Sequence, residues 1–298
     1  MSRPKVVAVV GPTASGKTSL AITLAQHCSG EVVSADSRQV YRGLDIGTGK
    51  VTAEEMQGIP HHLIDIADPH TIYTAADFER DAHAAITAIL TRDRTPIVAG
   101  GSFFYLELLR GRMRPAPVPP NETLRAELAN HSTEELFAQL QAADPQRAAT
   151  IDPHNRRRLI RSLEIIAALG KVPPATPIAS PYQWCLIGLH REPEELRARF
   201  RSRITDWLAR GFAEEVRQLE AGGITPSRFE ELGFEYSLMR QHLAGELSET
   251  ALVDTFVAQN WQYAKRQYTW LKRDPAIQWF TPDQQSAIIS TVEAFLAD

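Results

Sequence analysis

The stretch that decides the fold of this chain is Gly11-Pro12-Thr13-Ala14-Ser15-Gly16-Lys17-Thr18. It matches the phosphate-loop pattern, in which four residues separate two glycines and a lysine and a hydroxyl residue follow. Before it, residues 6–10 are a valine-rich run, typical of a strand that is buried on both faces of a parallel sheet. After it, residues 18–25 have apolar side chains at helical spacing and contain no Gly or Pro. Strand, loop and helix in this order predict an α/β protein.

The loop itself is predicted to bind a di- or triphosphate. In such loops the backbone N–H groups and the positive end of the following helix face the phosphate oxygens. Lys17 can reach a terminal phosphate, and the Thr18 hydroxyl can ligate Mg²⁺. The alternative, a glycine-rich turn that binds nothing, is disfavoured by the flanking strand and helix. The predicted phosphate-binding residues are Gly11, Thr13, Ala14, Ser15, Gly16, Lys17 and Thr18.

The composition is that of an ordinary globular protein. The chain has 298 residues, of which 43% are hydrophobic and 23% charged. The formal net charge of −4 argues against a basic coat for nucleic acid, although it leaves room for local basic clusters. The two cysteines lie in apolar stretches, which favours core positions in a reducing compartment. We find no zinc-binding spacing, signal peptide or membrane-spanning run, and expect a cytoplasmic protein.

Further apolar runs alternate with amphipathic segments along most of the chain. Strands are expected at 31–34, 62–66, 95–101, 184–189 and 277–280, and helices at 74–90, 102–109, 194–210, 213–221 and 249–271. Two proline-rich stretches, 114–120 and 173–181, enclose a segment of short helices. The prediction is a parallel-sheet core like that of phosphate-loop NTPases, flanked by helices and formed by residues 1–112 and 183–298, with an inserted all-helical lobe at 113–182.

Two polar residues follow strands of the predicted sheet. Asp36 comes just after the strand at 31–34, and Ser102 follows the double glycine that ends the strand at 95–101. Sites in parallel α/β folds lie at such strand ends, so both side chains are expected near the phosphate loop. For Asp36 the alternative is a helix or turn cap, a common use of Asp-Ser. His61 and His62 are adjacent in a predicted strand and point to opposite sides, so they do not face one metal.

Two segments are strongly basic. The predicted helix at 155–169 carries four arginines, and residues 263–273 interleave cations with aromatic side chains. Cations among aromatics suit an RNA backbone with splayed, stacked bases. The other interpretation of 263–273 is a helix end whose cations offset the helix dipole. The segment alone does not separate the two.

Taken together, these segments resemble the tRNA dimethylallyltransferase (isopentenyltransferase) family over nearly the whole chain. The matching blocks are the phosphate loop, Asp36-Ser37-Arg38-Gln39-Val40-Tyr41-Arg42-Gly43-Leu44-Asp45-Ile46-Gly47-Thr48, His61-His62-Leu63-Ile64-Asp65, Gly100-Gly101-Ser102, Arg158-Leu159-Ile160-Arg161-Ser162-Leu163-Glu164 and Ala264-Lys265-Arg266-Gln267-Tyr268-Thr269-Trp270. The phosphate loop is shared by many families. Its combination with the Asp36 block and the block at 264–270 is specific.

The resemblance implies transfer of a dimethylallyl group from dimethylallyl diphosphate to N6 of adenosine 37 in tRNA, with Mg²⁺ and release of diphosphate. The partners would be dimethylallyl diphosphate and the tRNA anticodon stem-loop, and we expect a monomer without a membrane partner. The implied catalytic residues are Asp36 as the base, Ser102 and Arg125; the phosphate loop would hold the diphosphate, and Thr18 the metal. The implied tRNA-binding residues are Asp36, Ser37, Arg38, Gln39, Arg157, Arg158, Arg161, Lys265, Arg266, Gln267, Trp270 and Lys272.

The chain departs from the family pattern at two places. Asn260-Trp261 stands where members usually carry Thr-Arg, and Leu232-Gly233-Phe234-Glu235-Tyr236 stands where many carry Ile-Gly-Tyr-Lys-Glu. Both changes remove a cation. Two other functions use the same loop: a small-molecule kinase or NTPase, which leaves the basic segments without a role, and a nucleotide-gated RNA-binding module, which needs no base at Asp36.

Overall fold

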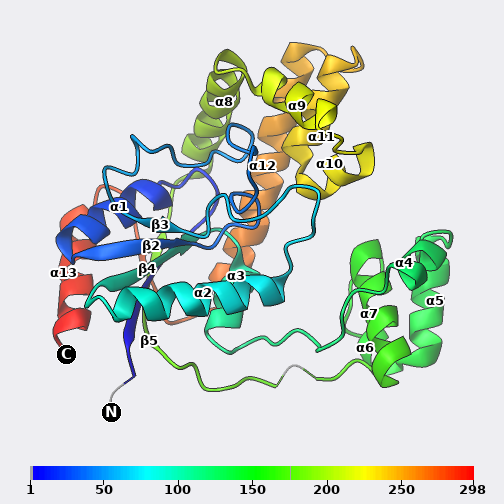
Figure 1. Ribbon diagram of the computed structural model, residues 1–298, viewed down its shortest axis with the longest axis horizontal. Coiled ribbons are helices and arrows are strands. Elements are labelled where there is room, and N and C mark those ends of the chain that lie inside the picture. Colours follow the sequence, from blue (N-terminus) through cyan, green and yellow to red (C-terminus); the bar gives the residue numbers. More distant parts are fainter. Residues whose placement is uncertain (1–2, 175) are drawn as a thin grey trace. The chain divides into compact units, whose positions relative to one another are not determined.

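An entirely parallel six-stranded sheet forms the centre of the larger part of the computed structural model (Figure 1). The structure describes residues 3–174 and 176–298. The strand order is β3-β2-β4-β1-β5-β6, which confirms the predicted fold class. The strands are β1 (Lys5–Val10), β2 (Gly30–Ser34), β3 (His61–His62), β4 (Thr95–Gly100), β5 (Gln183–Leu189) and β6 (Ile277–Phe280).

Helices cover both faces of this sheet. Helices α1 (Lys17–His27) and α13 (Gln285–Ala297) lie on one face, and α2 (Ala75–Leu90) and α3 (Phe103–Leu109) lie on the other (Figure 1). Val7 and Val9 of β1 pack toward α1 and α13, and the alternate residues are buried as well. This double burial explains why the strand is apolar throughout. Within the described ranges, no helix has the length and apolarity needed to cross a membrane.

Five consecutive helices before β6 form a second apolar core. They are α8 (Pro193–Ala209), α9 (Phe212–Ala221), α10 (Pro226–Leu232), α11 (Phe234–Leu243) and α12 (Glu249–Leu271). Phe200, Phe212 and Phe256 are fully or almost fully buried there, and Val40 and Leu44 of the segment after β2 pack into the same cluster. Helices α8 to α12 therefore fix the segment that follows Asp36.

A second compact unit, which we call the helical unit, spans Gly111–Ile178; Met1–Arg110 and Ala179–Asp298 form the sheet unit. The helical unit contains α4 (Glu122–Leu128), α5 (Thr133–Ala143), α6 (Pro145–Ala148) and α7 (Arg156–Leu169), with its own core around Leu136, Leu140 and Leu159. The helical unit ends at Ile178, whereas the sequence predicted that the inserted lobe ends at residue 182. Tyr182 accompanies the sheet unit because its hydroxyl lies 2.8 Å from His83 Nδ1.

The strand predicted at 62–66 is wrong in its extent. Strand β3 contains only His61 and His62. Leu63 and Asp65 have φ angles of +64° and +56°, in the left-handed region, so the chain cannot continue extended. The Asp65 carboxylate pairs with the buried Lys50 ammonium, and that ion pair holds the turn in place.

Candidate active site

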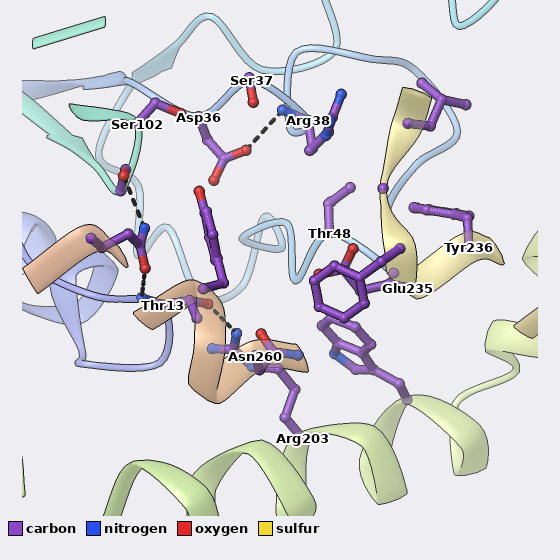
Figure 2. A pocket seen from close by; sticks show the side chains of 18 of the residues that line it. Thr13, Asp36, Ser37, Arg38, Thr48, Ser102, Arg203, Glu235, Tyr236 and Asn260 are labelled. Carbon is purple, nitrogen blue, oxygen red and sulfur yellow. Dashed lines mark hydrogen bonds between the residues drawn. The ribbon is translucent and has the colours of Figure 1, made fainter. Parts of the chain in front are cut away.

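Three strand ends meet at one edge of the sheet, as expected for the carboxyl ends of parallel strands. The phosphate loop follows β1, Asp36 follows β2, and Ser102 follows β4. A Cβ on Gly100 would collide with the Ala35 backbone, so glycine is required for the ends of β2 and β4 to approach. The close approach places Asp36 and Ser102 beside the phosphate loop, and Figure 2 shows both side chains directed at one pocket.

The phosphate loop has the backbone of an anion-binding turn. Gly16 has a φ of +102° as the N-cap of α1, and Ala14 also has a positive φ, of +60°. The Lys17 ammonium curls back and donates to the Pro12 carbonyl at 2.6 Å. The Ser15 hydroxyl is buried in the loop and has no hydrogen-bond partner in the described parts of the chain. Consecutive N–H groups in such a turn form a concave site for phosphate oxygens.

Three arginines donate hydrogen bonds to oxygen atoms of this loop. Arg191 and Arg199 donate through Nε to the carbonyls of Ser15 and Ala14, at 2.8 and 2.7 Å. Arg203 donates to the Thr13 hydroxyl at 3.0 Å. These contacts fix the backbone of the loop, whose Thr13 and Ser15 N–H groups donate to the Gln267 side chain and the Pro12 carbonyl. Sequence reasoning gave no role to these arginines, although Arg199 and Arg203 are four residues apart on α8 and share one face.

The cations at the loop are crowded. Burial and, to a smaller extent, the neighbouring Arg203 guanidinium lower the pKa of Lys17 to about 8, and Asp36 partly opposes both effects. Burial and the nearby Arg199 also lower the pKa of Arg203. Like charges held this close in a partly buried site favour a polyvalent anion, because its charge offsets their repulsion and lost hydration.

The two carboxylate oxygens of Asp36 have different surroundings. Its Oδ1 accepts the backbone N–H groups of Arg38 at 2.8 Å and Gln39 at 3.3 Å, so the capping interpretation is correct. Its Oδ2 has no hydrogen bond to any residue that the structure describes, and it stays available for chemistry. The cap fixes the direction of the carboxylate, so the two interpretations are compatible.

Two cavities meet at Asp36. The first, which we call the phosphate cavity, has a volume of about 470 Å³ and is lined by the phosphate loop, the first turns of α1, Arg199 and Arg203. The second, which we call the aromatic cavity, has a volume of about 240 Å³ and lies among Trp207, Phe234 and Tyr263. The residues common to both cavities are Thr13, Lys17, Asp36, Thr48, Gly101 and Arg203. A group bound in one cavity can thus meet a group bound in the other beside the Asp36 carboxylate.

The wall of the aromatic cavity depends on a carboxylate that sequence reasoning missed. Glu215 of α9 accepts the N–H groups of three consecutive residues, 45–47, at 2.6–3.0 Å, and the Tyr236 hydroxyl at 2.8 Å. This carboxylate fixes the segment that carries Thr48 against the wall that carries Tyr236. The local sequence around Glu215 does not predict this contact, because Glu215 is 168 residues from Gly47.

Oxygen ligands for Mg²⁺ are present at the phosphate cavity. Thr18 is exposed in the first turn of α1, and it lines this cavity together with Asp36. No cluster of three His, Cys, Asp or Glu side chains suited to a metal occurs in the described ranges. Mg²⁺ in phosphate sites is typically held by one or two protein oxygens, substrate phosphate and water. The residues present fit that mode, with Thr18 as the predicted ligand.

The predicted RNA-binding residues of α12 and the residue after it differ in exposure. Lys265, Arg266 and Lys272 are exposed, and each cation lies 5.6–5.9 Å from an aromatic ring. Trp270 stacks on Phe103 with ring centroids 4.9 Å apart. The basic-aromatic segment therefore presents its cations to solvent.

Gln267, which is predicted to contact RNA, lines the aromatic cavity and is also engaged within the protein. Its side chain is buried, its Oε1 accepts from the Thr13 N–H at 2.9 Å, and its Nε2 donates to the Gly101 carbonyl at 2.9 Å. Both ends of the amide are used inside the protein, where they join the phosphate loop to the end of β4. Gln39 is engaged in a similar way, because its Nε2 donates to the Gly49 carbonyl at 3.2 Å. Ser37 and Arg38 line the aromatic cavity.

The remaining predicted residues belong to the helical unit. Arg125 and Arg161 both pair with the buried Glu164 carboxylate, at 2.8 and 3.1 Å. Arg157 and Arg158 are exposed on α7. The ion pairs show that Arg125 and Arg161 help to hold α7 within its unit. The catalytic role of Arg125 and the RNA contacts of the three α7 arginines stay predictions.

A parallel sheet with a phosphate loop after β1 and a carboxylate between two cavities defines a phosphate-loop protein equipped for group transfer. The model of the IPP transferase family matches residues 39–274. The chain belongs to this family, and it is a prenyltransferase.

Named relatives cover nearly the whole chain. The tRNA dimethylallyltransferase of Thermomicrobium roseum is 43% identical over 95% of this chain and 88% of its own length. The tRNA dimethylallyltransferase of Geobacter sulfurreducens is 38% identical over 98% of this chain and 96% of its own length. The crystal structure of the Bacillus halodurans tRNA isopentenylpyrophosphate transferase superposes with a TM-score of 0.73 at 36% identity, covering 99% of this chain and 96% of that one. A eukaryotic dimethylallyltransferase described as acting on tRNA gives a TM-score of 0.78 at 28% identity, covering 93% and 74%.

Proposed function

We propose that this protein transfers the dimethylallyl group of dimethylallyl diphosphate to N6 of adenosine 37 in tRNA. The observation that carries the proposal is Asp36, whose unpaired carboxylate oxygen lies where the phosphate cavity meets the aromatic cavity. The names of the relatives support this reaction, and they favour it over a small-molecule kinase that uses the same loop. A kinase would also leave the exposed cations of α12 without a role.

The phosphate cavity suits the donor. As the allylic C–O bond breaks, negative charge builds on the diphosphate leaving group. Lys17, Arg203 and the loop N–H groups are positioned to stabilise that charge as it develops. Mg²⁺ on Thr18 would neutralise part of the same charge when bound.

The aromatic cavity suits the acceptor. An exocyclic adenine amine is a weak nucleophile because its lone pair is delocalised into the ring. As the new C–N bond forms, one amine proton must leave, and Asp36 Oδ2 is available to accept it. General-base help of this kind contributes ~10²–10⁴-fold. The target base must leave its stack at a cost of a few kcal/mol, which aromatic contacts in the cavity would offset.

The proposal extends to the oligomeric state, the compartment, the metal ion and the substrates of the enzyme. We propose a monomer that acts in the cytoplasm with Mg²⁺, on dimethylallyl diphosphate and the anticodon stem-loop of tRNA. Cys28 and Cys185 are both unpaired thiols, as a reducing compartment would leave them.

The decisive experiment supplies labelled dimethylallyl diphosphate, Mg²⁺ and an anticodon stem-loop with three adjacent adenosines. We expect label in the RNA and one diphosphate released per label. A matched stem-loop whose target base lacks the 6-amino group should stay unlabelled. Hydrolysis of ATP with no label in the RNA would contradict the proposal.

A further inference from the structure

Glu235 is a carboxyl that the proposed mechanism does not use, and it lies at the aromatic cavity. It belongs to the first turn of α11, directly after the sharp turn at Gly233, whose φ is +149°. Its Oε2 lies 2.7 Å from the point where a Cβ on Gly233 would stand, and the Arg38 Nε lies 3.9 Å from the same point. Figure 2 shows Asp36 and Glu235 approaching the pocket from different elements. Glu235 thus faces the same ligand space as Asp36.

The aromatic cavity that Glu235 lines contains charged and titratable residues from several elements. Burial is the main influence and, with the Asp36 charge, it raises the pKa of Glu235 to about 7, while a hydrogen bond from the residue's own backbone N–H and the charges of Arg38 and Arg203 oppose the increase. No cation lies within ion-pair distance of its carboxyl in the part of the chain that the structure describes. The ionisable groups that share the cavity are Lys17, Asp36, Arg38, Arg203, Glu230, Tyr236, Tyr263 and Arg266.

A neutral carboxyl here has a use that a charged one lacks. Its O–H can donate a hydrogen bond, whereas the Asp36 carboxylate can only accept. Adenine carries an N–H donor at C6 with an acceptor ring nitrogen on each side of it, N1 and N7. One accepting carboxylate and one donating carboxyl in the same cavity therefore match two neighbouring positions of adenine. Guanine does not match, because its O6 would face the Asp36 carboxylate.

We propose that Glu235 is a specificity residue that donates a hydrogen bond to a ring nitrogen beside the target amine, while Asp36 receives the amine proton. This inference rests on the proposed function, because it needs adenine in the aromatic cavity. It also gives a role to a position where the chain departs from its family pattern.

The test compares three substitutions at the cavity. Glu235→Gln keeps an N–H donor that does not titrate, Glu235→Ala removes the donor, and Glu230→Gln alters an exposed carboxyl at the same cavity as a control. With saturating dimethylallyl diphosphate, whose negative charge favours the protonated form of Lys17, we expect kcat/KM of the wild-type protein for the stem-loop to fall at least tenfold between pH 6 and pH 9, as Glu235 ionises. The kcat/KM of Glu235→Gln should not show this fall between pH 6 and pH 9, whereas the kcat/KM of Glu230→Gln should fall as it does in the wild-type protein.

Altered RNA tests the contact without relying on a variant. Stem-loops that carry 1-deazaadenosine or 7-deazaadenosine at the target lack one acceptor nitrogen each. We expect the wild-type protein to lose about tenfold in kcat/KM and in equilibrium binding on one of them, the loss of one hydrogen bond. Glu235→Ala should show no further loss on that RNA, as a double-mutant cycle requires for a direct contact.

The proposal is overturned if Glu235→Gln follows the wild-type pH profile, or if both deaza RNAs bind and react like the unmodified one. Failure of the proposed function has a different signature, since no label would then reach unmodified RNA with any variant. The binding comparison still reports on Glu235 in that case.

Discussion

At the scale of single residues, the site depends on how completely each polar group is occupied. Lys17, Arg199 and Arg203 donate to atoms of the phosphate loop, and Gln267 uses both ends of its amide inside the protein. Asp36 differs, because one carboxylate oxygen holds the backbone turn and the other is unpaired within the described residues. A group that is oriented by one atom and available at another is well suited to general-base catalysis.

This division of labour predicts the effect of Asp36→Asn. The amide oxygen still accepts from the Arg38 and Gln39 N–H groups, so we expect unchanged thermal stability and RNA affinity within about threefold. The basic oxygen is lost, so single-turnover transfer should fall at least ~100-fold. Asp68→Asn is the matched control, because Asp68 Oδ1 caps the His70 N–H at 2.8 Å in the same way, and its transfer rate should not change. A parallel loss of stability and rate in Asp36→Asn would assign the residue to capping alone.

At the scale of elements, α8 connects the helical core to the phosphate loop. Leu196, Phe200 and Ile204 bury one face of this helix in the second core. Arg199 and Arg203, one turn apart on another face, contact the loop. Arg201 points elsewhere and pairs with the exposed Asp254 at 2.7 Å. One helix thus carries arginines with very different surroundings.

The contrast predicts unequal effects of alanine substitution along α8. Arg203→Ala should lower kcat/KM for dimethylallyl diphosphate roughly 10- to 100-fold, since a charged hydrogen bond at an anion site is lost. Arg201→Ala should stay within about twofold, because exposed ion pairs contribute little. Steady-state kinetics at fixed RNA, with affinity for a non-reactive donor analogue, measures both. Equal effects of the two substitutions would show that α8 does not contribute to the donor site.

At the scale of the whole molecule, two units have separate hydrophobic cores. The chain leaves the sheet unit and returns to it at neighbouring points, since the Ile178 N–H donates to the Gly111 carbonyl at 2.8 Å. The phosphate loop, Asp36, Ser102 and both cavities belong to the sheet unit. The proposed donor site thus lies within the sheet unit, whereas the helical unit carries Arg125, predicted to be catalytic, and the α7 arginines that are predicted to contact RNA.

Removing the helical unit tests this arrangement. Replacing residues 112–177 by a short Gly-Ser linker should leave a folded sheet unit whose affinity for diphosphate stays within about threefold of the full chain. Transfer to the stem-loop should fall at least ~100-fold, since the unit predicted to hold RNA is gone. Calorimetric titration with diphosphate and the labelled transfer assay measure the two effects. Full transfer activity in the shortened chain would contradict a role of the helical unit in RNA binding.

The amino-acid sequence by itself determined the phosphate loop, the parallel sheet and the two candidate strand-end residues, Asp36 and Ser102. These features are local: glycine spacing, apolar runs and helical periodicity are set within about ten to twenty neighbouring residues. The strand predicted at 62–66 was wrong because left-handed φ angles at Leu63 and Asp65 follow from tertiary contacts, which outweigh local preference.

Only the tertiary structure decided which distant groups complete the phosphate loop and the wall of the aromatic cavity. Gln267 reaches Thr13 across 254 residues, Arg203 reaches it across 190, and Glu215 reaches Gly47 across 168. Glu235 faces the ligand space of Asp36 because Gly233 turns the chain into the aromatic cavity. Local patterns show which face of a helix is apolar, but they do not show which strand end the opposite face will meet. Tertiary packing decides which strand end that face meets. In this protein, packing brings arginines to the phosphate loop and Glu235 to the aromatic cavity, although the sequence pattern assigned neither to the site.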